Sequence, residues 1–204
     1  MKSIAILDYG SGNLRSAQRA IEHIGAAVEI TSDADVALNA DGLVVPGVGA
    51  FKACMSGILG VDGKAIMSMR VAAKRPVLGI CIGMQVLFTK GLEHSEGESG
   101  GTDGCAIWPG EVAQLSAPVL PHMGWNNVKA GANSKLLAGL DGESFYFVHS
   151  YAIKQSSGLI ESRTTYGESF IAAAEDGIVS ATQFHPEKSG DVGLQLLKNW
   201  VQSL

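Results

Sequence analysis

The sequence is poor in cysteine and aromatic residues, and it has no long apolar run. Of its 204 residues, three are cysteines (Cys54, Cys81 and Cys105), and no two of them form a C-x-x-C pair. An odd number of scattered cysteines argues against a disulfide framework and against a zinc site. No segment approaches the roughly 20 apolar residues of a membrane span. Asp8 and Gly10 interrupt the N-terminal apolar stretch too early for a signal peptide. We therefore expect a cytoplasmic protein that does not enter a membrane.

Positive charge is also scarce. The 15 lysines and arginines are outnumbered by 20 aspartates and glutamates, which gives a formal net charge of −5. Such a balance offers no electrostatic footprint for a nucleic acid or an anionic membrane. The sequence has no phosphate-binding loop and no cluster of metal-ligating residues, and Arg15 stands where Gly10-Ser11-Gly12 would need a third glycine to make a dinucleotide fingerprint. We expect neither a metal ion nor an organic cofactor.

The first half of the chain alternates between strand-like and helix-like patterns. Short apolar runs predict buried strands at Ser3–Leu7, Val28–Thr31, Gly42–Val45 and Val77–Ile80. Helical patterns are present from Leu14 to Ile24, over roughly Lys64–Ala73, and over Met84–Phe88. Short strands that alternate with helical segments favour a parallel sheet with helices on both faces.

Strand-like segments dominate the second half, after a polar, glycine-rich loop at Glu96–Gly104. They cover Ser144–Ile153, Leu159–Tyr166, Phe170–Ala174 and Ile178–His185. The last two are joined through Asp176-Gly177, a strong hairpin signal. The chain closes on an amphipathic helix that carries Leu196 and Trp200. We predict one α/β domain over residues 1–204, with a mixed, mostly parallel sheet.

A thiol stands at a tight corner between the fourth predicted strand and the helical pattern that follows it. The segment reads GICIGMQ, residues 79–85, with Cys81 between Gly79 and Gly83. This is the layout of a nucleophile elbow, where only small neighbours let the backbone turn sharply and present the side chain. The start of a helix favours a thiolate and can bind an oxyanion. The alternative is that Cys81 is a small buried hydrophobe, as many free cysteines are.

A thiol nucleophile needs a base, and His185 is the best candidate among the five histidines. It ends an apolar strand in the segment Gln183-Phe184-His185-Pro186-Glu187. Pro186 favours an extended backbone at His185, and residues two apart on extended backbone project to the same side. Glu187 can therefore orient the imidazole and stabilise its protonated form. The alternative is a histidine at a strand end beside a surface glutamate. With the elbow, the pair predicts a Cys81–His185–Glu187 triad.

Acyl transfer also requires hydrogen-bond donors for an oxyanion. The backbone N–H of Ile82, the residue after the thiol, is one candidate. The loop Pro46-Gly47-Val48-Gly49 follows the third predicted strand, and its two glycines leave the backbone free to aim an N–H at a neighbouring strand end. An ordinary glycine-rich connection between a strand and a helix has the same composition.

These residues resemble the class I (triad) glutamine amidotransferases. More narrowly, the chain resembles the family of glutaminase subunits of imidazole glycerol phosphate synthases. The segments that carry the likeness, in chain order, are DYGSGNL (8–14), PGVG (46–49), GICIGMQ (79–85), PHMGWN (121–126), FVHSY (147–151) and QFHPEKS (183–189). They extend over nearly the whole chain, and the first and fourth are specific to the narrower family. The resemblance implies a flavodoxin-like, three-layer α/β domain.

The resemblance also implies the reaction. Cys81 attacks the side-chain amide of glutamine, His185 moves the proton, Glu187 orients His185, and water hydrolyses a γ-glutamyl thioester. Gly49 and Ile82 match the positions that supply the oxyanion N–H groups. The positions that hold the glutamine head group are matched by Gln85, Glu93, Ser150 and Tyr151.

In this family the ammonia passes to a partner, a cyclase subunit that is a (β/α)8 barrel, within a heterodimer. There it helps to form imidazole glycerol phosphate and aminoimidazole carboxamide ribotide in histidine biosynthesis. The positions that meet the partner are matched by Asn13, Trp125, Asn126, Tyr146 and Lys188. By composition alone Trp125 could equally be a core residue, because most tryptophans are largely buried.

Three other interpretations remain open at the level of sequence. Another triad amidotransferase, such as the glutaminase of pyridoxal-phosphate synthase or an anthranilate synthase component, is disfavoured by DYGSGNL and PHMGWN. A free-standing cysteine hydrolase is disfavoured by the QFHPE ending. A non-catalytic module that only binds a barrel partner is disfavoured by the presence of Cys81, His185 and Glu187 together.

Overall fold

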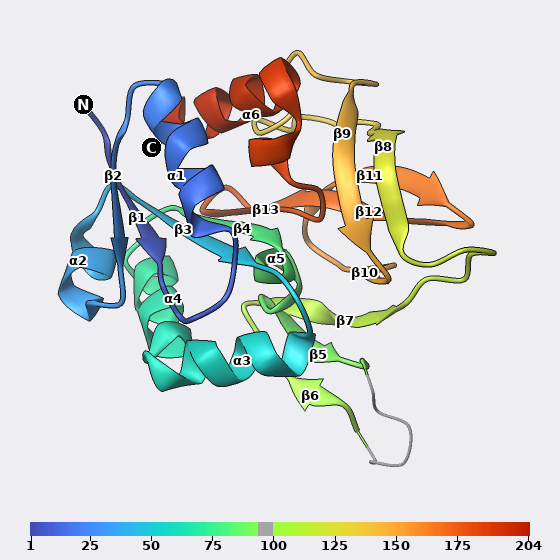
Figure 1. Cartoon of the computed structure of the whole chain (residues 1–204), viewed down its shortest axis with the longest axis horizontal. Coiled ribbons are helices and arrows are strands. Elements are labelled where there is room, and N and C mark those ends of the chain that lie inside the picture. Colours follow the sequence, from blue (N-terminus) through green and yellow to red (C-terminus); the bar gives the residue numbers. More distant parts are fainter. Residues whose placement is uncertain (94–99) are drawn as a thin grey trace.

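A mixed β-sheet forms the centre of the computed structural model, which describes residues 1–93 and 100–204 (Figure 1). In spatial order, its strands within the described residues are β11 (Ile160–Tyr166), β12 (Glu168–Glu175), β13 (Val179–Thr182), β4 (Val77–Cys81), β3 (Gly42–Gly47), β1 (Ser3–Leu7) and β2 (Ala27–Thr31). The strands from β13 to β2 run parallel, whereas β12 and β11 extend the sheet in antiparallel pairs. The predicted α/β fold with a mixed, mostly parallel sheet is confirmed, and the Asp176-Gly177 hairpin joins β12 to β13.

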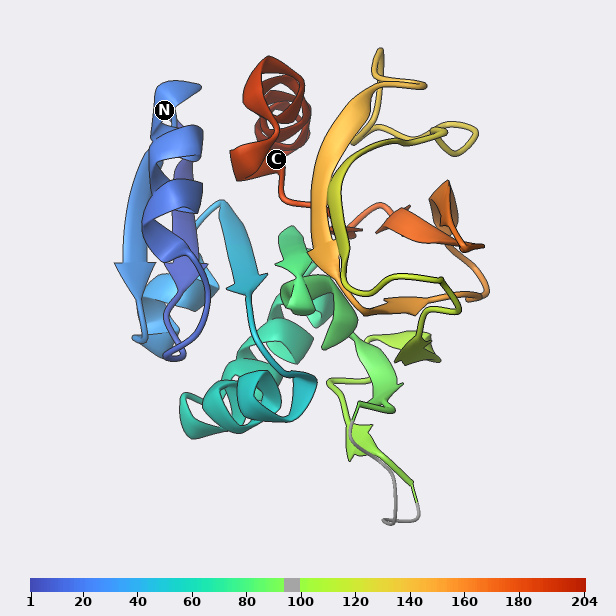
Figure 2. The ribbon, with the colours of Figure 1, turned by 45° about the vertical axis from the view of Figure 1, so that its right-hand side comes forward.

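Helices pack on both sides of this sheet (Figures 1 and 2). They are α1 (Leu14–His23), α2 (Ala34–Asn39), α3 (Phe51–Gly60), α4 (Gly63–Ala72), the single turn α5 (Ile82–Gln85) and α6 (Gly190–Gln202), with a 3₁₀ turn at Pro186–Lys188. The N-terminal helix α1 lies against the C-terminal helix α6, and α2 lies against α4. No helix in the described part of the chain is long and apolar enough to cross a membrane.

Two neighbouring strands, β3 and β4, are buried along their whole length. Parallel strands covered on both faces read as continuous apolar runs rather than alternating ones, which explains the segments LVV and VLGI. The register pairs Gly47 with Cys81 at the carboxyl ends of these strands. The loop after β3 and the thiol corner after β4 therefore meet at one edge of the sheet, where ligands bind in open α/β folds.

Two smaller sheets lie beside the main one. One contains β10 (Tyr151–Ile153), β7 (Trp108–Gln114), β5 (Phe88–Gly91) and β6 (Thr102–Asp103). The other pairs β8 (His122–Asn127) with β9 (Ser144–His149) in antiparallel register, and β9 lies next to α6 (Figure 2). The predicted strand Ser144–Ile153 is thus two strands, β9 and β10, interrupted at Ser150.

Other sequence predictions also need correction. The helical segment predicted at Met84–Phe88 ends at Gln85, and Phe88 begins β5, because its strand pairs with β7. β3 extends through Pro46 to Gly47 instead of stopping at Val45. The helices α2 and α3 were not predicted. Of the predicted loop Glu96–Gly104, residues 96–99 lie outside the described residues, and Thr102–Asp103 forms the short strand β6.

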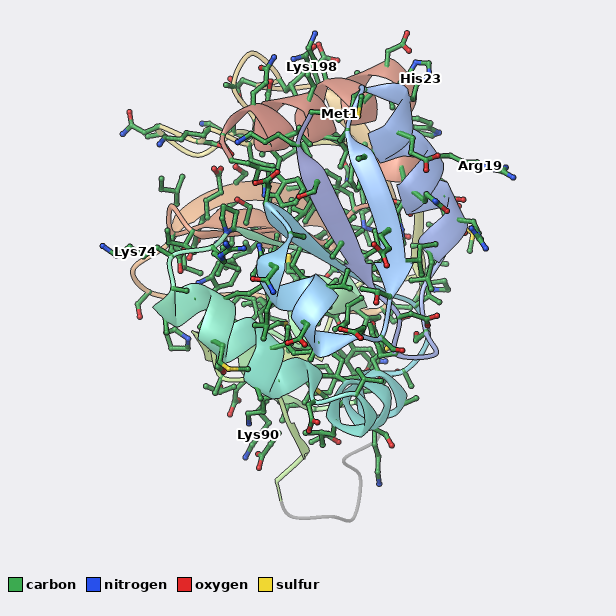
Figure 3. All side chains as sticks on the ribbon, turned by 90° about the vertical axis from the view of Figure 1, so that its left-hand side faces the viewer. Met1, Arg19, His23, Lys74, Lys90 and Lys198 are labelled. Carbon is green, nitrogen blue, oxygen red and sulfur yellow. The ribbon has the colours of Figure 1, made fainter. Side chains whose placement is uncertain are left out.

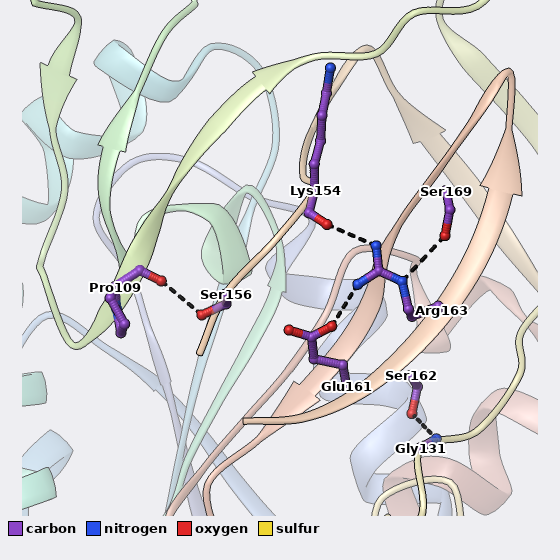
Figure 4. A network of polar contacts seen from close by, with 8 residues as sticks. All are labelled: Pro109, Gly131, Lys154, Ser156, Glu161, Ser162, Arg163 and Ser169. Atoms are coloured by element: carbon purple, nitrogen blue, oxygen red, sulfur yellow. Dashed lines mark hydrogen bonds and ion pairs between the residues drawn. The ribbon is translucent and has the colours of Figure 1, made fainter. Parts of the chain in front are cut away.

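Arg163 fastens the outer strand β11 to its surroundings (Figure 4). Its guanidinium pairs with Glu161 at 2.5 Å, donates to the Lys154 carbonyl at 2.8 Å and donates to the Ser169 hydroxyl at 3.2 Å. Beside it, Ser162 accepts a hydrogen bond from the backbone N–H of Gly131 at 2.9 Å. The Arg163 and Lys129 backbones also exchange two hydrogen bonds of 2.9 Å, which cover part of a strand edge that would otherwise be open to pairing with another chain.

A buried arginine of α4 connects this helix to α2 and to the start of β4. Arg70 of α4 is fully buried, and its guanidinium donates at 2.8–3.2 Å to backbone carbonyls near the end of α2 and at the start of β4. The acceptors are the carbonyls of Ala37, Leu38, Ala40, Asp41 and Pro76. The last carbonyls of a helix have no partner within the helix, so Arg70 satisfies groups that burial would otherwise leave unpaired.

We predict that Arg70→Met destabilises the fold, because the methionine fills similar space but leaves these buried carbonyls without a donor. A loss of about 3 kcal/mol is expected from hydrogen bonds to a charged group, or a melting temperature about 10 °C lower. Thermal unfolding followed by circular dichroism measures this. The control is Arg19→Met on the exposed surface of α1 (Figure 3), and equal melting of the two variants would contradict the prediction.

Candidate active site

The thiol corner has the strained backbone that the sequence predicted. Cys81 ends β4 with φ +57° and ψ −112°, a conformation that costs a non-glycine residue energy. The flanking glycines make room for it. A Cβ on Gly83 would lie 1.7 Å from the Val45 carbonyl oxygen, and one on Gly79 would lie 2.5 Å from the Gly83 carbonyl oxygen. Both positions therefore require glycine, and the corner presents Cys81 at the start of α5.

His185 and Glu187 form a buried pair, as predicted, although the strand β13 ends at Thr182 and Glu187 lies in the 3₁₀ turn Pro186–Lys188 instead of on extended backbone. The His185 Nδ1 atom lies 2.7 Å from Glu187 Oε1, and the two side chains are 2% and 3% exposed. The backbone of this turn is also held, because His185 N–H donates to the Tyr146 carbonyl at 2.9 Å and Ser189 Oγ donates to the His185 carbonyl at 2.6 Å. The Nε2 atom is buried and makes no well-aligned hydrogen bond within the described residues.

The surroundings of His185 favour its protonated form. Burial alone would lower the pKa of His185, but hydrogen bonds and charge interactions with Cys81 and Glu187 outweigh burial and raise the pKa to about 9. A charged imidazole is the form that accompanies a thiolate and that can return a proton to a leaving group. The thiol, the imidazole and the carboxylate thus act on one another electrostatically as one unit.

A chain of hydrogen-bonded polar side chains also reaches the thiol. Gln183 donates from Nε2 to Cys81 Sγ at 3.8 Å, and its Oε1 accepts from Gln85 Nε2 at 3.0 Å. Gln85 Nε2 also donates to the Tyr151 carbonyl at 2.8 Å. Both glutamines are buried. The amide hydrogens of Gln85 are therefore used inside the chain, so Gln85 supports the wall of the site.

The loop after β3 is held by side chains from behind. The Tyr9 hydroxyl donates to the Pro46 carbonyl at 2.5 Å. The Val48 carbonyl accepts from Ser11 Oγ at 2.8 Å and from Cys54 Sγ at 3.3 Å. In a trans peptide the C=O and the following N–H point in opposite directions. The N–H of Gly49, whose φ is +91°, therefore points away from Ser11 and Cys54.

One cavity of about 610 Å³ joins these groups, a size typical of a small-molecule site. Its lining includes predicted catalytic, oxyanion and glutamine-binding residues, namely Cys81, His185, Gly49, Ile82, Gln85, Glu93, Ser150 and Tyr151. Glu187 is in contact with His185 behind the lining. Glu93 follows β5, and its Oε2 accepts a hydrogen bond from the N–H of Phe51, the first residue of α3, at 2.6 Å. The described residues contain no group of three or more metal-ligating side chains placed around one point.

The predicted partner-binding residues lie partly together. Trp125 of β8 is 60% exposed, and its ring meets that of Tyr146 edge-on, with centroids 6.1 Å apart. The Lys188 ammonium lies 6.0 Å from the Tyr146 ring centroid. Asn126 follows Trp125, and its amide donates inward to the Thr165 carbonyl at 3.0 Å. Asn13 lies at the start of α1. An exposed tryptophan beside a tyrosine and a cation is typical of an interface anchor.

Sequence reasoning missed several residues of this site, among them Gln183 and His149. Gln183 is two residues before His185, so the same alternation that linked His185 to Glu187 could have indicated it. His149 lines the cavity, and the residue it hydrogen-bonds, His122, lies on the neighbouring strand β8. No local sequence pattern could therefore have indicated its role.

The fold and the site together define a class. A mixed, mostly parallel sheet with a strained thiol corner and a buried histidine–glutamate pair is the arrangement of a triad amidotransferase, and residues 5–203 match the family model described as "Glutamine amidotransferase class-I". The chain is also 58% identical to imidazole glycerol phosphate synthase subunit HisH from Mycolicibacterium paratuberculosis and 56% identical to the subunit from Mycobacterium tuberculosis, with 100% of this chain and 98% of each relative covered. The chain therefore belongs to the class I glutamine amidotransferases and, within them, to the HisH subunits of imidazole glycerol phosphate synthase.

Solved structures share the fold at low sequence identity. One described as a glutamine amidotransferase has a TM-score of 0.77 at 16% identity, covering 98% of this chain and 99% of its own. The glutaminase domain of Trypanosoma brucei CTPS with bound acivicin has a TM-score of 0.67 at 17% identity, covering 99% and 94%. These likenesses support the fold.

We predict that Gly83→Ala prevents normal folding of the corner. The new methyl group would overlap the Val45 carbonyl in the backbone of β3, which can move only at a high cost in free energy. A loss of at least about 3 kcal/mol is expected for overpacking against backbone. The matched control is Gly60→Ala at the end of α3, where a Cβ has no neighbour within 4 Å. Thermal unfolding of both variants tests this, and a Gly83→Ala protein that melts like the wild type would contradict it.

We also predict a pH dependence of stability that comes from His185. Its pKa is about 9 in the folded chain against 6.5 for an ordinary histidine, so the folded state binds more protons between these values. The stabilisation is fully present below pH 6.5 and is lost as pH rises through 9. Glu187→Gln removes one cause of the raised pKa, so its melting temperature should fall less steeply over this range.

Unfolding is measured in steps of pH for the wild type and for Glu187→Gln. Other groups that titrate in this range are common to both proteins, so the difference between the two slopes reports His185. Parallel curves would contradict the assigned cause.

Proposed function

We propose that this chain hydrolyses glutamine as the glutaminase subunit of an imidazole glycerol phosphate synthase and delivers the ammonia to a cyclase subunit. The observation that carries the proposal is the enclosed arrangement of Cys81, His185 and Glu187 at one cavity. The names of the full-length relatives supply the reaction in which such an arrangement is used.

In the first half of the reaction, the Cys81 sulfur attacks the side-chain carbonyl carbon of glutamine, and His185 holds the proton of the thiol. The carbonyl oxygen becomes an oxyanion that accepts hydrogen bonds from the N–H groups of Gly49 and Ile82. The bond between carbon and nitrogen then breaks, His185 returns the proton to the leaving nitrogen, and ammonia departs. A γ-glutamyl thioester on Cys81 remains.

In the second half, His185 accepts a proton from water as the water attacks the thioester. The bond between carbon and sulfur breaks, glutamate leaves, and the thiol is restored with the proton. Glu187 keeps the Nδ1 side of the ring occupied at 2.7 Å, so Nε2 is the nitrogen that exchanges protons in both halves.

The cavity also offers groups for the head of glutamine. Glu93 lines the cavity, and its carboxylate suits the substrate ammonium group. The corner at Ser150 and Tyr151, where β9 gives way to β10, lines the same cavity. We assign glutamine binding to Gln85, Glu93, Ser150 and Tyr151, with Gln85 acting through the wall that it supports.

The partner of this reaction is a cyclase subunit, which we propose to be a (β/α)8 barrel that docks over the cavity mouth. Lys188 both lines the cavity and lies beside Tyr146, so a partner seated on Trp125 and Tyr146 would also cover the entrance. Asn13 and Asn126 would complete the docking face. Ammonia released at Cys81 would then leave into the partner instead of into solvent.

The test measures glutamate release by the chain alone and with the cyclase subunit and its nucleotide ligand. We expect low activity alone and a large rise with the loaded partner. Cys81→Ala should lose at least about 10⁴-fold, as for other removed nucleophiles, whereas the buried Cys105→Ala, remote from the cavity lining, should retain activity.

A covalent glutamine analogue should label the wild type at Cys81. High activity that the partner does not change would point to a free-standing hydrolase. No activity in either state, with Cys81 unlabelled, would point to a binding module and contradict the proposal.

A further inference from the structure

Two buried histidines outside the triad join β8 to the wall of the cavity. His122 of β8 and His149 of β9 are opposite one another in the strand pair, and their side chains are in contact, with Nδ1 of His122 3.1 Å from Nε2 of His149. The outer nitrogen of His122, Nε2, lies 3.3 Å from the Asn126 amide nitrogen. The inner nitrogen of His149, Nδ1, lies 2.9 Å from the Tyr151 carbonyl oxygen.

The Tyr151 carbonyl, at one end of this chain of hydrogen bonds, determines which ring nitrogens carry the protons. The Tyr151 carbonyl can only accept, so His149 Nδ1 carries a hydrogen and its Nε2 is a bare acceptor in the neutral ring. His122 Nδ1 must then donate to it, which leaves His122 Nε2 to accept from the Asn126 amide. Asn126 has two amide hydrogens, and the other goes to the Thr165 carbonyl. Every ring nitrogen of the two histidines has a partner. Asn126 donates to His122, His122 donates to His149, and His149 donates to the Tyr151 carbonyl.

The packing around the pair excludes water and favours this neutral arrangement. His122 and His149 are 3% and 6% exposed. The His122 ring stacks on Tyr166 with centroids 4.1 Å apart and on Phe147 at 4.8 Å. Burial lowers the pKa of His122 to about 4 and the pKa of His149 to about 3. Both rings are therefore uncharged near pH 7 and held in fixed orientations.

The Tyr151 carbonyl connects the two histidines to the glutamine side chains at the thiol. It accepts from His149 on one side and from Gln85 on the other. Gln85 in turn holds Gln183, whose amide lies 3.8 Å from Cys81 Sγ. His149 also lines the cavity itself. The orientation of one backbone carbonyl therefore affects both the Ser150–Tyr151 corner and the amide beside the nucleophile.

We propose that His122 and His149 are positioning residues for glutamine hydrolysis: the hydrogen-bonded pair fixes the Tyr151 carbonyl, and through it the Ser150–Tyr151 corner and the Gln85–Gln183 amides at the thiol. The inference rests on the proposed function. Neither histidine exchanges a proton with substrate in this role. Their contribution is geometric, so it should affect the binding of glutamine and the reactivity of Cys81 together.

The test uses two variants of the same shape, His149→Asn and His149→Leu, in the complex with the cyclase subunit and its ligand. The asparagine amide nitrogen can take the place of Nδ1 and donate to Tyr151, whereas leucine cannot donate. We expect His149→Leu to raise the KM for glutamine and to slow labelling of Cys81 by a glutamine analogue, each by about tenfold, the range of one hydrogen bond. His149→Asn should recover most of both.

Thermal unfolding separates positioning from stability, because both variants lose the ring and should melt at similar temperatures. If His149→Leu does not fold, His122→Phe replaces it: the phenyl ring keeps the stacking on Tyr166 and Phe147 but leaves His149 Nε2 without a donor. His122→Phe should raise the KM for glutamine and slow the labelling of Cys81, each by about threefold. The control is His23→Gln on the exposed end of α1 (Figure 3), which should change neither value.

Equal KM values and equal labelling rates for His149→Asn and His149→Leu, or wild-type values for a folded His122→Phe, would overturn this inference while the wild-type complex remains an active glutaminase. A wild-type complex that releases no glutamate would overturn the proposed function and this inference with it.

Discussion

The site depends on one constraint, the left-handed backbone of Cys81 between two glycines at the end of a buried strand. A residue with a side chain at Gly79 or Gly83 would collide with backbone of the corner or of β3. The strain is maintained because β3 and β4 are buried throughout and cannot relax. The pairing of β3 with β4 also sets Gly47 opposite Cys81, so the candidate oxyanion loop begins next to the nucleophile.

The rest of the site is built from the strands that flank this corner. β13 runs parallel to β4, and the chain leaves it directly into Gln183 and His185, which both interact with the thiol. His185 and Glu187 are removed from water, and the 2.7 Å contact between Nδ1 and the carboxylate favours the protonated imidazole. Buried polar groups that are fully paired hold one geometry, whereas unpaired ones are costly. The hydrogen bonds that connect Asn126, through the two histidines and Tyr151, to Gln183 hold the cavity wall in one geometry in the same way.

The sequence alone predicted the parts of the structure that depend on local patterns. The strand Ser3–Leu7 and the thiol corner follow from apolar runs and glycine spacing. The His185–Glu187 pair was predicted correctly from residues two apart, but the 3₁₀ turn Pro186–Lys188, and not extended backbone, brings the two side chains together. Phe88 was assigned to a helix because a short apolar segment takes its form from the strand with which it pairs, here β7. The helices α2 and α3 were missed as well. The His122–His149 contact joins residues 27 positions apart, and only the pairing of β8 with β9 brings them together.

The central claim is that the strained Cys81 is the residue that carries the acyl group of glutamine. The most direct measurement is mass spectrometry of the chain after rapid acid quenching during turnover with glutamine, the cyclase subunit and its ligand. We expect a γ-glutamyl adduct on the peptide that contains Cys81, which disappears when glutamine is consumed. Glutamate formation with no adduct at Cys81, or with the adduct on Cys54 or Cys105, would contradict the account.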